Sequence, residues 1–158
     1  TAFTVQYDFV GPKRFDLDFT NKDGKKEEAI VIHRSSIGAI ERIMAFLIEK
    51  YAGNFPVWLS PIQVAVTPIS EKHISYVKGV NDKLVEVKIR TELMDGNDTL
   101  NKKIREAEMQ KIPYLLIIGD KEVQENVVSV RERGKGDLGL MKLEEFLEKI
   151  KEEIKEKK

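Results

Sequence analysis

The apolar run Tyr114-Leu115-Leu116-Ile117-Ile118, which follows Pro113 and precedes Gly119, decides the fold of this chain. Proline and glycine at its ends limit the run to the length of a strand, and a strand without polar alternation is typical of one that is buried on both faces. We therefore predict that residues 114–118 form the central strand of a sheet.

Strand and helix patterns alternate around this central strand. Strands are predicted at 63–69, 85–93 and 126–133, and apolar spacings of three and four predict a helix over about 70–84. This order predicts a compact α/β domain with a mixed sheet. The other expected elements are a helix with N-cap Asp98 that carries Leu100, Ile104 and Ala107, a turn at Gly134, Gly136 and Gly139, and a last helix with the stripe Leu143, Phe146, Leu147, Ile150 and Ile154.

A proline-containing segment marks a boundary between two parts of the chain. Pro56 and Pro61 exclude a helix over residues 54–61 and predict an extended crossover, so we place two domains at residues 1–53 and 54–158. The first domain is expected to hold antiparallel strands at 4–9, 15–19 and 28–33, a turn at 21–24, and a helix over 36–51 that ends at Ala52-Gly53.

Composition excludes several classes of protein. The 158 residues include 27 Lys and Arg, 27 Asp and Glu, and no cysteine, which rules out disulfides, a thiolate nucleophile and an all-cysteine zinc site. The sequence has neither a long apolar stretch nor a signal peptide, so we expect no membrane insertion and a cytoplasmic location. Because the net charge is zero, any contact with nucleic acid must be local.

The segment 33–42 joins a strand end to the first turns of a helix and contains residue types suited to anion binding. Gly38 permits close approach to the backbone, and the planar guanidinium of Arg42 could lie on a phosphate or an adenine ring. Taken alone, Arg42 fits a surface residue better than a ligand contact. His33, at the strand end, fits a structural histidine better than a metal ligand.

The order and spacing of several motifs resemble the class II aminoacyl-tRNA synthetases, and within them the threonyl-tRNA synthetases. The resemblance covers nearly the whole chain, because eight motifs fall in register. They are Thr4-Val5-Gln6-Tyr7-Asp8-Phe9, Pro12 to Leu17, His33-Arg34, Gly38-Ala39-Ile40-Glu41-Arg42, Phe55 to Gln63, Lys103-Ile104-Arg105-Glu106, Ile112-Pro113-Tyr114 and Gly119-Asp120-Lys121-Glu122-Val123.

The resemblance implies that residues 1–53 are the C-terminal portion of a class II catalytic domain, an antiparallel sheet edge that includes the third signature motif. It implies that Arg42 contacts ATP, which acts with Mg²⁺ as a substrate, and that His33 is one of three zinc ligands, the other two lying upstream. A zinc ion that binds the threonine hydroxyl rejects valine, which lacks that group. The implied substrate-binding residues are Thr4, Gln6 and Gly38.

The resemblance also implies that residues 54–158 are an anticodon-binding domain in which Glu122, Arg131 and Asn97 read bases. Strand periodicity supports part of this, because Arg131 and Arg133 are two residues apart and Lys135 follows them, a basic set that can grip RNA. The carboxylate of Glu122 can accept hydrogen bonds from the edges of unstacked bases. Without the resemblance, Glu122 is equally consistent with a solvated turn residue between two strands.

The implied function of the complete protein is to activate threonine with ATP and to transfer it to tRNA(Thr). A homodimer is expected, and the 158-residue chain alone is expected to be inactive because most of the catalytic machinery lies upstream. One alternative is a non-catalytic, synthetase-like RNA-binding module. Another is a prolyl or histidyl enzyme of the same subgroup, although His33-Arg34 before the glycine motif favours threonine.

Overall fold

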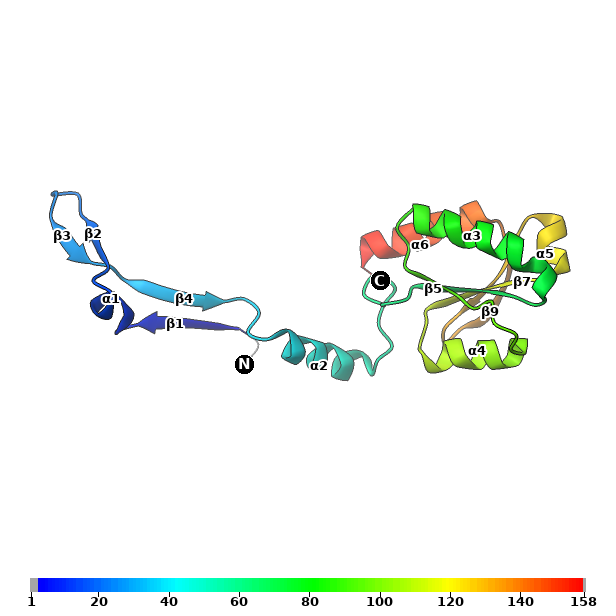
Figure 1. The fold of residues 1–158 in the computed structure, drawn as a ribbon, viewed down its shortest axis with the longest axis horizontal. Helices are drawn as coiled ribbons and strands as arrows, with labels where there is room; N and C mark the ends of the chain where they lie inside the picture. Colours follow the sequence, from blue (N-terminus) through cyan, green and yellow to red (C-terminus); the bar gives the residue numbers. More distant parts are fainter. Residues whose placement is uncertain (1–2, 158) are drawn as a thin grey trace. The chain divides into compact units, whose positions relative to one another are not determined.

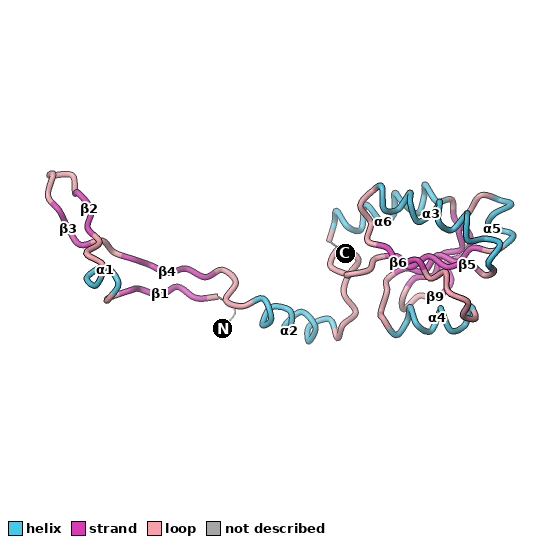
Figure 2. Tube along the Cα trace, in the orientation of Figure 1, coloured by secondary structure: helices cyan, strands magenta, loops and turns pink. Residues whose placement is uncertain are grey.

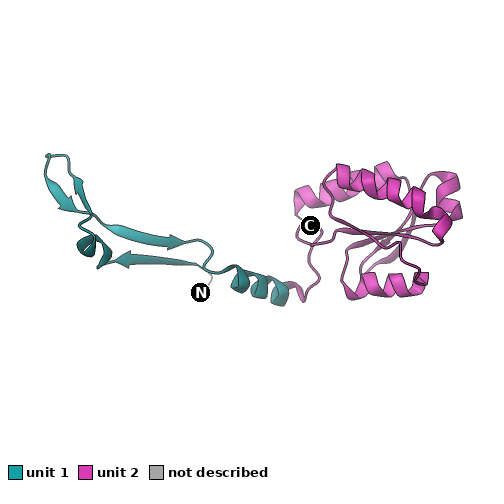
Figure 3. Ribbon diagram, viewed as in Figure 1, with its two compact units in different colours: residues 1–50 teal, residues 51–158 magenta. Residues whose placement is uncertain are grey.

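The computed structural model describes residues 3–157, and the chain divides into an N-terminal unit, residues 1–50, and a C-terminal unit, residues 51–158 (Figure 3). A five-stranded sheet with the order β6-β5-β7-β8-β9 forms the centre of the C-terminal unit. Neighbours β6, β5 and β7 run parallel, whereas β8 and β9 are antiparallel, so the predicted mixed sheet is confirmed. The strands are β5 Val64–Pro68, β6 Thr91–Leu93, β7 Tyr114–Ile118, β8 Val128–Glu132 and β9 Gly136–Met141.

Helices cover both faces of this sheet (Figures 1 and 2). Helices α3, Ile74–Glu86, and α6, Leu143–Glu156, lie on one face, and α4, Leu100–Met109, lies on the other. The alternation of β7 divides its side chains between two cores, with Tyr114, Leu116 and Ile118 facing α3 and α6, and Leu115 and Ile117 facing α4. The prediction of a central strand buried on both faces is therefore confirmed.

The predicted strand over residues 85–93 is largely wrong, because α3 continues to Glu86 and only Thr91–Leu93 form β6. The predicted start at 70 is also shifted, since the short 3₁₀ helix η1, Glu71–His73, precedes α3. Lys88 adopts a left-handed conformation, with φ of 64°, and reverses the chain between α3 and β6. Single-residue turns of this kind need no glycine, so the apolar residues around the turn resembled a strand.

Two helix starts also differ from prediction. Thr99, not Asp98, is the N-cap of α4, because its hydroxyl accepts a hydrogen bond from Lys102 N. Helix α5, Asp120–Glu125, lies where no element was predicted, and it ends at Asn126 in a left-handed conformation. The predicted strand over 126–133 therefore shortens to β8.

The predicted turn at the last glycines is wrong in part. Only Gly134 lies in the turn, because Gly136 begins β9 and Gly139 lies inside it. Both β9 glycines have positive φ, 80° and 87°, and the pairing with β8 shifts between Val130 and Arg131. A bulged, glycine-containing edge strand lacks the regular alternation from which strands are predicted.

The N-terminal unit contains two separate antiparallel pairs, where the sequence predicted one sheet. Strand β1 pairs with β4, and β2 pairs with β3. Helix α1 precedes the predicted strand 15–19, because Asp8 Oδ1 accepts hydrogen bonds from the N–H groups of Val10 and Gly11, and Pro12 starts the helix. Of the predicted strand, only the part from Asp18 onward is in β2. The elements are β1 Thr4–Asp8, α1 Gly11–Arg14, β2 Asp18–Thr20, β3 Lys26–Glu28, β4 Val31–Ser35 and α2 Ile40–Tyr51.

None of the helices in the described part of the chain combines the length and the apolar character that crossing a bilayer requires. No residue of helix α2 is buried, and its apolar side chains Ile40, Met44 and Phe46 are all more than half exposed.

Phe146 on α6 packs edge-on against Tyr114 of β7 at 5.3 Å between ring centroids. We expect Phe146→Ala to lower the free energy of unfolding by about 3–5 kcal/mol, because it removes a fully buried ring and leaves a cavity. Urea denaturation followed by circular dichroism measures this loss. Val85→Ala, at a position that is 53% exposed, is the control and should change stability by less than about 0.5 kcal/mol.

Candidate nucleic-acid interface

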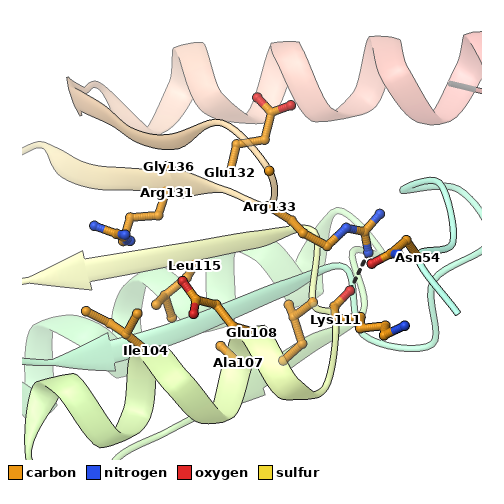
Figure 4. A pocket seen from close by; sticks show the side chains of 12 residues that line it. Asn54, Ile104, Ala107, Glu108, Lys111, Leu115, Arg131, Glu132, Arg133 and Gly136 are labelled. Carbon is orange, nitrogen blue, oxygen red and sulfur yellow. Dashed lines mark hydrogen bonds between the residues drawn. The ribbon is translucent and has the colours of Figure 1, made fainter. Parts of the chain in front are cut away.

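Strand β8 places Arg131 beside Leu115, on the face of the sheet that α4 covers. Arg131 lines a cavity of about 360 Å³ whose apolar wall includes Ile104, Ala107 and Leu115 (Figure 4). Among residues 3–157, no side chain or carbonyl forms a hydrogen bond or ion pair with the Arg131 guanidinium. A planar cation above an apolar wall can stack on a ring and donate to its edge.

The predicted basic set of Arg131, Arg133 and Lys135 is wrong as a unit. Arg133 lies beyond the end of β8, and its guanidinium donates to Phe55 O at 2.7 Å. It also donates to Lys111 O (Figure 4). Burial lowers the pKa of Arg133 from its usual value. Arg133 therefore ties the segment after α2 to the sheet through both terminal nitrogens, whereas the Arg131 guanidinium has no such partner among residues 3–157.

Glu132 holds two lysines on the opposite face of β8 from Arg131. Its carboxylate lies 2.7 Å from Lys135 Nζ and 3.2 Å from Lys149 Nζ, and its side chain is 15% exposed. Burial by itself raises the pKa of Glu132, but the hydrogen bonds from the two lysines outweigh it and place the pKa below its usual value. Lys135 is exposed and available to a polyanion only in competition with Glu132.

Two further predicted residues follow the carboxyl ends of parallel strands. Asn97 is exposed in the loop between β6 and α4, and Glu122 lies in the first turn of α5, directly after β7. Because the carboxyl ends of β6 and β7 meet at one edge of the sheet, Asn97 and Glu122 share that edge. Arg131 instead lies beside the start of β7, so the three residues do not form one cluster.

Glu122 is buried, so the alternative that it is a solvated turn residue is wrong. Its Oε2 atom accepts a hydrogen bond from Gly119 N at 2.8 Å and thereby caps α5. A Cβ atom at Gly119 would lie 2.6 Å from Ile69 Cδ1 and 3.1 Å from Glu122 Oε2, so a side chain there would require Ile69 to move. The carboxylate of Glu122 is thus held in a fixed orientation beside the loop that follows β5.

An ion-pair cluster ties the loops at this edge together. Lys72 Nζ lies 2.7 Å from Asp120 Oδ1, and His73 Nε2 lies 3.1 Å from the same atom, which links η1 to the first residue of α5. Hydrogen bonds from Lys72 and then from His73 lower the pKa of Asp120. His73 is itself buried, although it is a polar residue at the start of a helix.

In the N-terminal unit, pairing of β1 with β4 brings three predicted residues onto one face. Gln6 lies directly opposite His33, and Thr4 lies two residues from Gln6 on the same side of the ribbon. Gly38 and Arg42 are exposed, the former in the bend before α2 and the latter on α2. These positions are compatible with the substrate-binding roles that the resemblance implies.

His33 Nε2 lies 2.9 Å from Asp8 Oδ2. The N–H of Gly11, together with His33 and the N–H of Val10, lowers the pKa of Asp8 to about 2. Residues 3–157 contain no group of three or more histidine, aspartate or glutamate side chains that could hold a metal ion. A zinc site takes about four ligands, so His33 with Asp8 does not make one by itself.

Comparison with known proteins bears on these features. The family described as "Anticodon binding domain" matches residues 63–153. The chain belongs to the anticodon-binding domain family. A threonine–tRNA ligase of Carboxydothermus hydrogenoformans is 50% identical over 98% of this chain and 24% of its own length. One of Caldanaerobacter subterraneus subsp. tengcongensis is 52% identical over 96% of this chain and 23% of its own length.

A solved structure supports the same assignment. The solved RNA-binding domain of threonyl-tRNA synthetase from Cryptosporidium parvum is 33% identical to this chain and superposes with a TM-score of 0.80. The match covers 96% of this chain and 38% of the solved chain. The predicted resemblance to the C-terminal part of threonyl-tRNA synthetases is therefore confirmed. The chain spans about a quarter of the length of the curated relatives it matches.

Sequence reasoning missed Lys103, which is buried between α4 and the sheet at 5% exposure. The helical spacing of Leu100, Ile104 and Ala107 places residue 103 on the same face. A lysine on an apolar face was therefore the available signal.

We expect Glu132→Gln to destabilise the chain at pH 7 by about 1–2 kcal/mol, because it removes the charge that two lysines contact. The folded-state pKa of Glu132 is lowered, so its contribution is present above the ordinary pKa of 4.5 and is lost as the pH falls through the folded value. The difference in free energy of unfolding between the unmodified chain and Glu132→Gln, measured by urea denaturation, should shrink below about pH 4.5. A difference that stays constant down to pH 3 would assign the loss to packing.

Proposed function

We propose that residues 54–158 recognise the anticodon of tRNA(Thr) as part of a threonine–tRNA ligase. The observation that carries this proposal is Arg131, whose guanidinium has no partner among residues 3–157 and lies in a cavity with an apolar wall, in a chain of the anticodon-binding family. Proteins read RNA sequence mainly from unstacked bases, which need a wall to pack against and donors at their edges. The Arg131 cavity has both.

In this proposal Glu122 and Asn97 read further bases from the edge at the carboxyl ends of β6 and β7. The Oε1 atom of Glu122 accepts no hydrogen bond within residues 3–157, so it can accept one from a base amino or imino group. The amide of Asn97 is exposed and offers both a donor and an acceptor. The separation of Arg131 from this edge suits the reading of successive bases in a splayed anticodon loop.

We also propose that the complete ligase activates threonine with ATP and Mg²⁺ and transfers it to tRNA(Thr), with residues 1–53 at the edge of the ATP site. The guanidinium of Arg42 would neutralise phosphate charge, and Thr4, Gln6 and Gly38 would line the substrate pocket. His33 would hold zinc only together with ligands from a longer chain. A homodimer and a cytoplasmic location belong to the same proposal. The relatives named for threonine favour this activity over a prolyl or histidyl one.

The proposal predicts that Arg131→Ala reduces the preference of the 158-residue chain for a threonine anticodon stem-loop over one with a changed anticodon by about 1–3 kcal/mol. Fluorescence anisotropy with labelled stem-loops measures both affinities across a salt series, since the phosphate contribution alone varies with ionic strength. Lys135→Ala is the control and should weaken binding to all loops alike. An unchanged preference in Arg131→Ala would remove Arg131 from base reading.

Glu122→Gln tests the second base reader without removing the cap on α5, because an amide oxygen can still accept from Gly119 N. We expect a loss of anticodon preference similar to that of Arg131→Ala, with the melting temperature changed by no more than a few degrees. Thermal unfolding and anisotropy on the same preparation separate the two effects. A fall in stability with the preference intact would assign Glu122 to the cap alone.

A further inference from the structure

Lys103 on α4 is a buried cation with little to bind. It is 5% exposed, and its ammonium donates one long hydrogen bond of 3.5 Å, to Pro68 O at the end of β5. An ammonium has three donors, and no carboxylate of residues 3–157 lies within 4.0 Å of this one. Burial of a charge without a partner is unfavourable, so a site that keeps such a lysine has a use for its remaining donors.

Lys103 lines a cavity of about 270 Å³ at the carboxyl ends of β5 and β6. Pro68 and half-exposed Ile69 supply an apolar wall. The rest of the lining is polar and comes from the loops that follow the two strands, with Ser70, Glu71, Asp95, Gly96, Asn97 and Asp98.

The charges around the cavity select the kind of group that Lys103 can bind. Three carboxylates line the cavity, and only that of Asp98 is paired within residues 3–157, with Lys102 at 2.7 Å. Glu71 and Asp95 would repel a phosphate, whereas a neutral ring with an acceptor for Lys103 and donors for these carboxylates suits the cavity. Guanine and uracil present a keto oxygen next to a ring N–H, which is such an arrangement.

We infer that Lys103 donates a hydrogen bond to the keto oxygen of one unstacked anticodon base and thereby selects guanine or uracil over adenine or cytosine. Adenine and cytosine carry an amino group in place of that oxygen, and it would face the ammonium donor to donor. A buried donor left without an acceptor costs more than a weak contact gains, so the discrimination is strong. This inference rests on the proposed anticodon recognition and adds a specificity-determining residue to it.

The test measures how each protein distinguishes keto from amino bases. Labelled stem-loops carry a threonine anticodon in which one keto base at a time is replaced by an amino base of the same ring size. Adenine replaces guanine, and cytosine replaces uracil. For the 158-residue chain we expect at least about fivefold weaker binding after the exchange at the position that Lys103 reads. Lys103→Met should reduce this ratio of affinities, before and after the exchange, to below about twofold. The ratios for exchanges at the other anticodon positions should stay unchanged.

Two further variants complete the experiment. Lys103→Gln offers both a donor and an acceptor, so it should lose the keto preference as well, and it gives the same answer where the methionine variant does not fold by circular dichroism. Lys151→Met removes the same charge from an exposed position on α6 and should retain the preference.

The outcomes separate this inference from the function on which it rests. Unchanged ratios in both Lys103 variants would overturn the inference while leaving anticodon recognition in place. Equal weakening of all loops would also overturn it, because that pattern indicates a phosphate contact. Failure of the unmodified chain to prefer any anticodon would overturn the proposed function itself.

Discussion

Burial of β7 on both faces is the constraint on which the C-terminal unit depends. All five of its side chains are buried, and they divide between two separate cores. Each core needs its own cover, which α3 and α6 provide on one face and α4 on the other. Polar side chains that bind a ligand are therefore confined to the strand ends, the connecting loops and the margins of the helical cover.

Most of the polar groups near β7 serve the architecture. Arg90 donates to the carbonyls of Trp58 and Ser60 and so holds the proline-containing segment that leads into β5. Gln63 continues this network, because its amide donates to Val57 O and accepts from Arg90 N. Arg131 and Lys103 differ chemically from these neighbours, because neither has a strong partner within residues 3–157.

Periodicity predicted the elements whose burial is regular. The apolar run of β7 and the stripe on α6 were recognised because each residue type matches its side of the element. It failed at Lys88, where a non-glycine residue turns the chain, and in β9, whose glycines and bulge break the alternation. Of the candidate site, the positions of Asn97, Glu122 and Arg131 came from resemblance. The burial of Glu122 and Lys103 depends on contacts between segments distant in the sequence, which a local sequence pattern does not predict.

The irregularity of β9 has a consequence for association between molecules. The outer strands of an open sheet expose unpaired backbone groups, and long, flat ones template aggregation. In this sheet β6 contains three residues, and β9 contains two residues with left-handed backbone and a shifted register. Neither margin offers a regular ladder to a second sheet. The glycines that made β9 hard to recognise thus protect the fold against polymerisation through its edges.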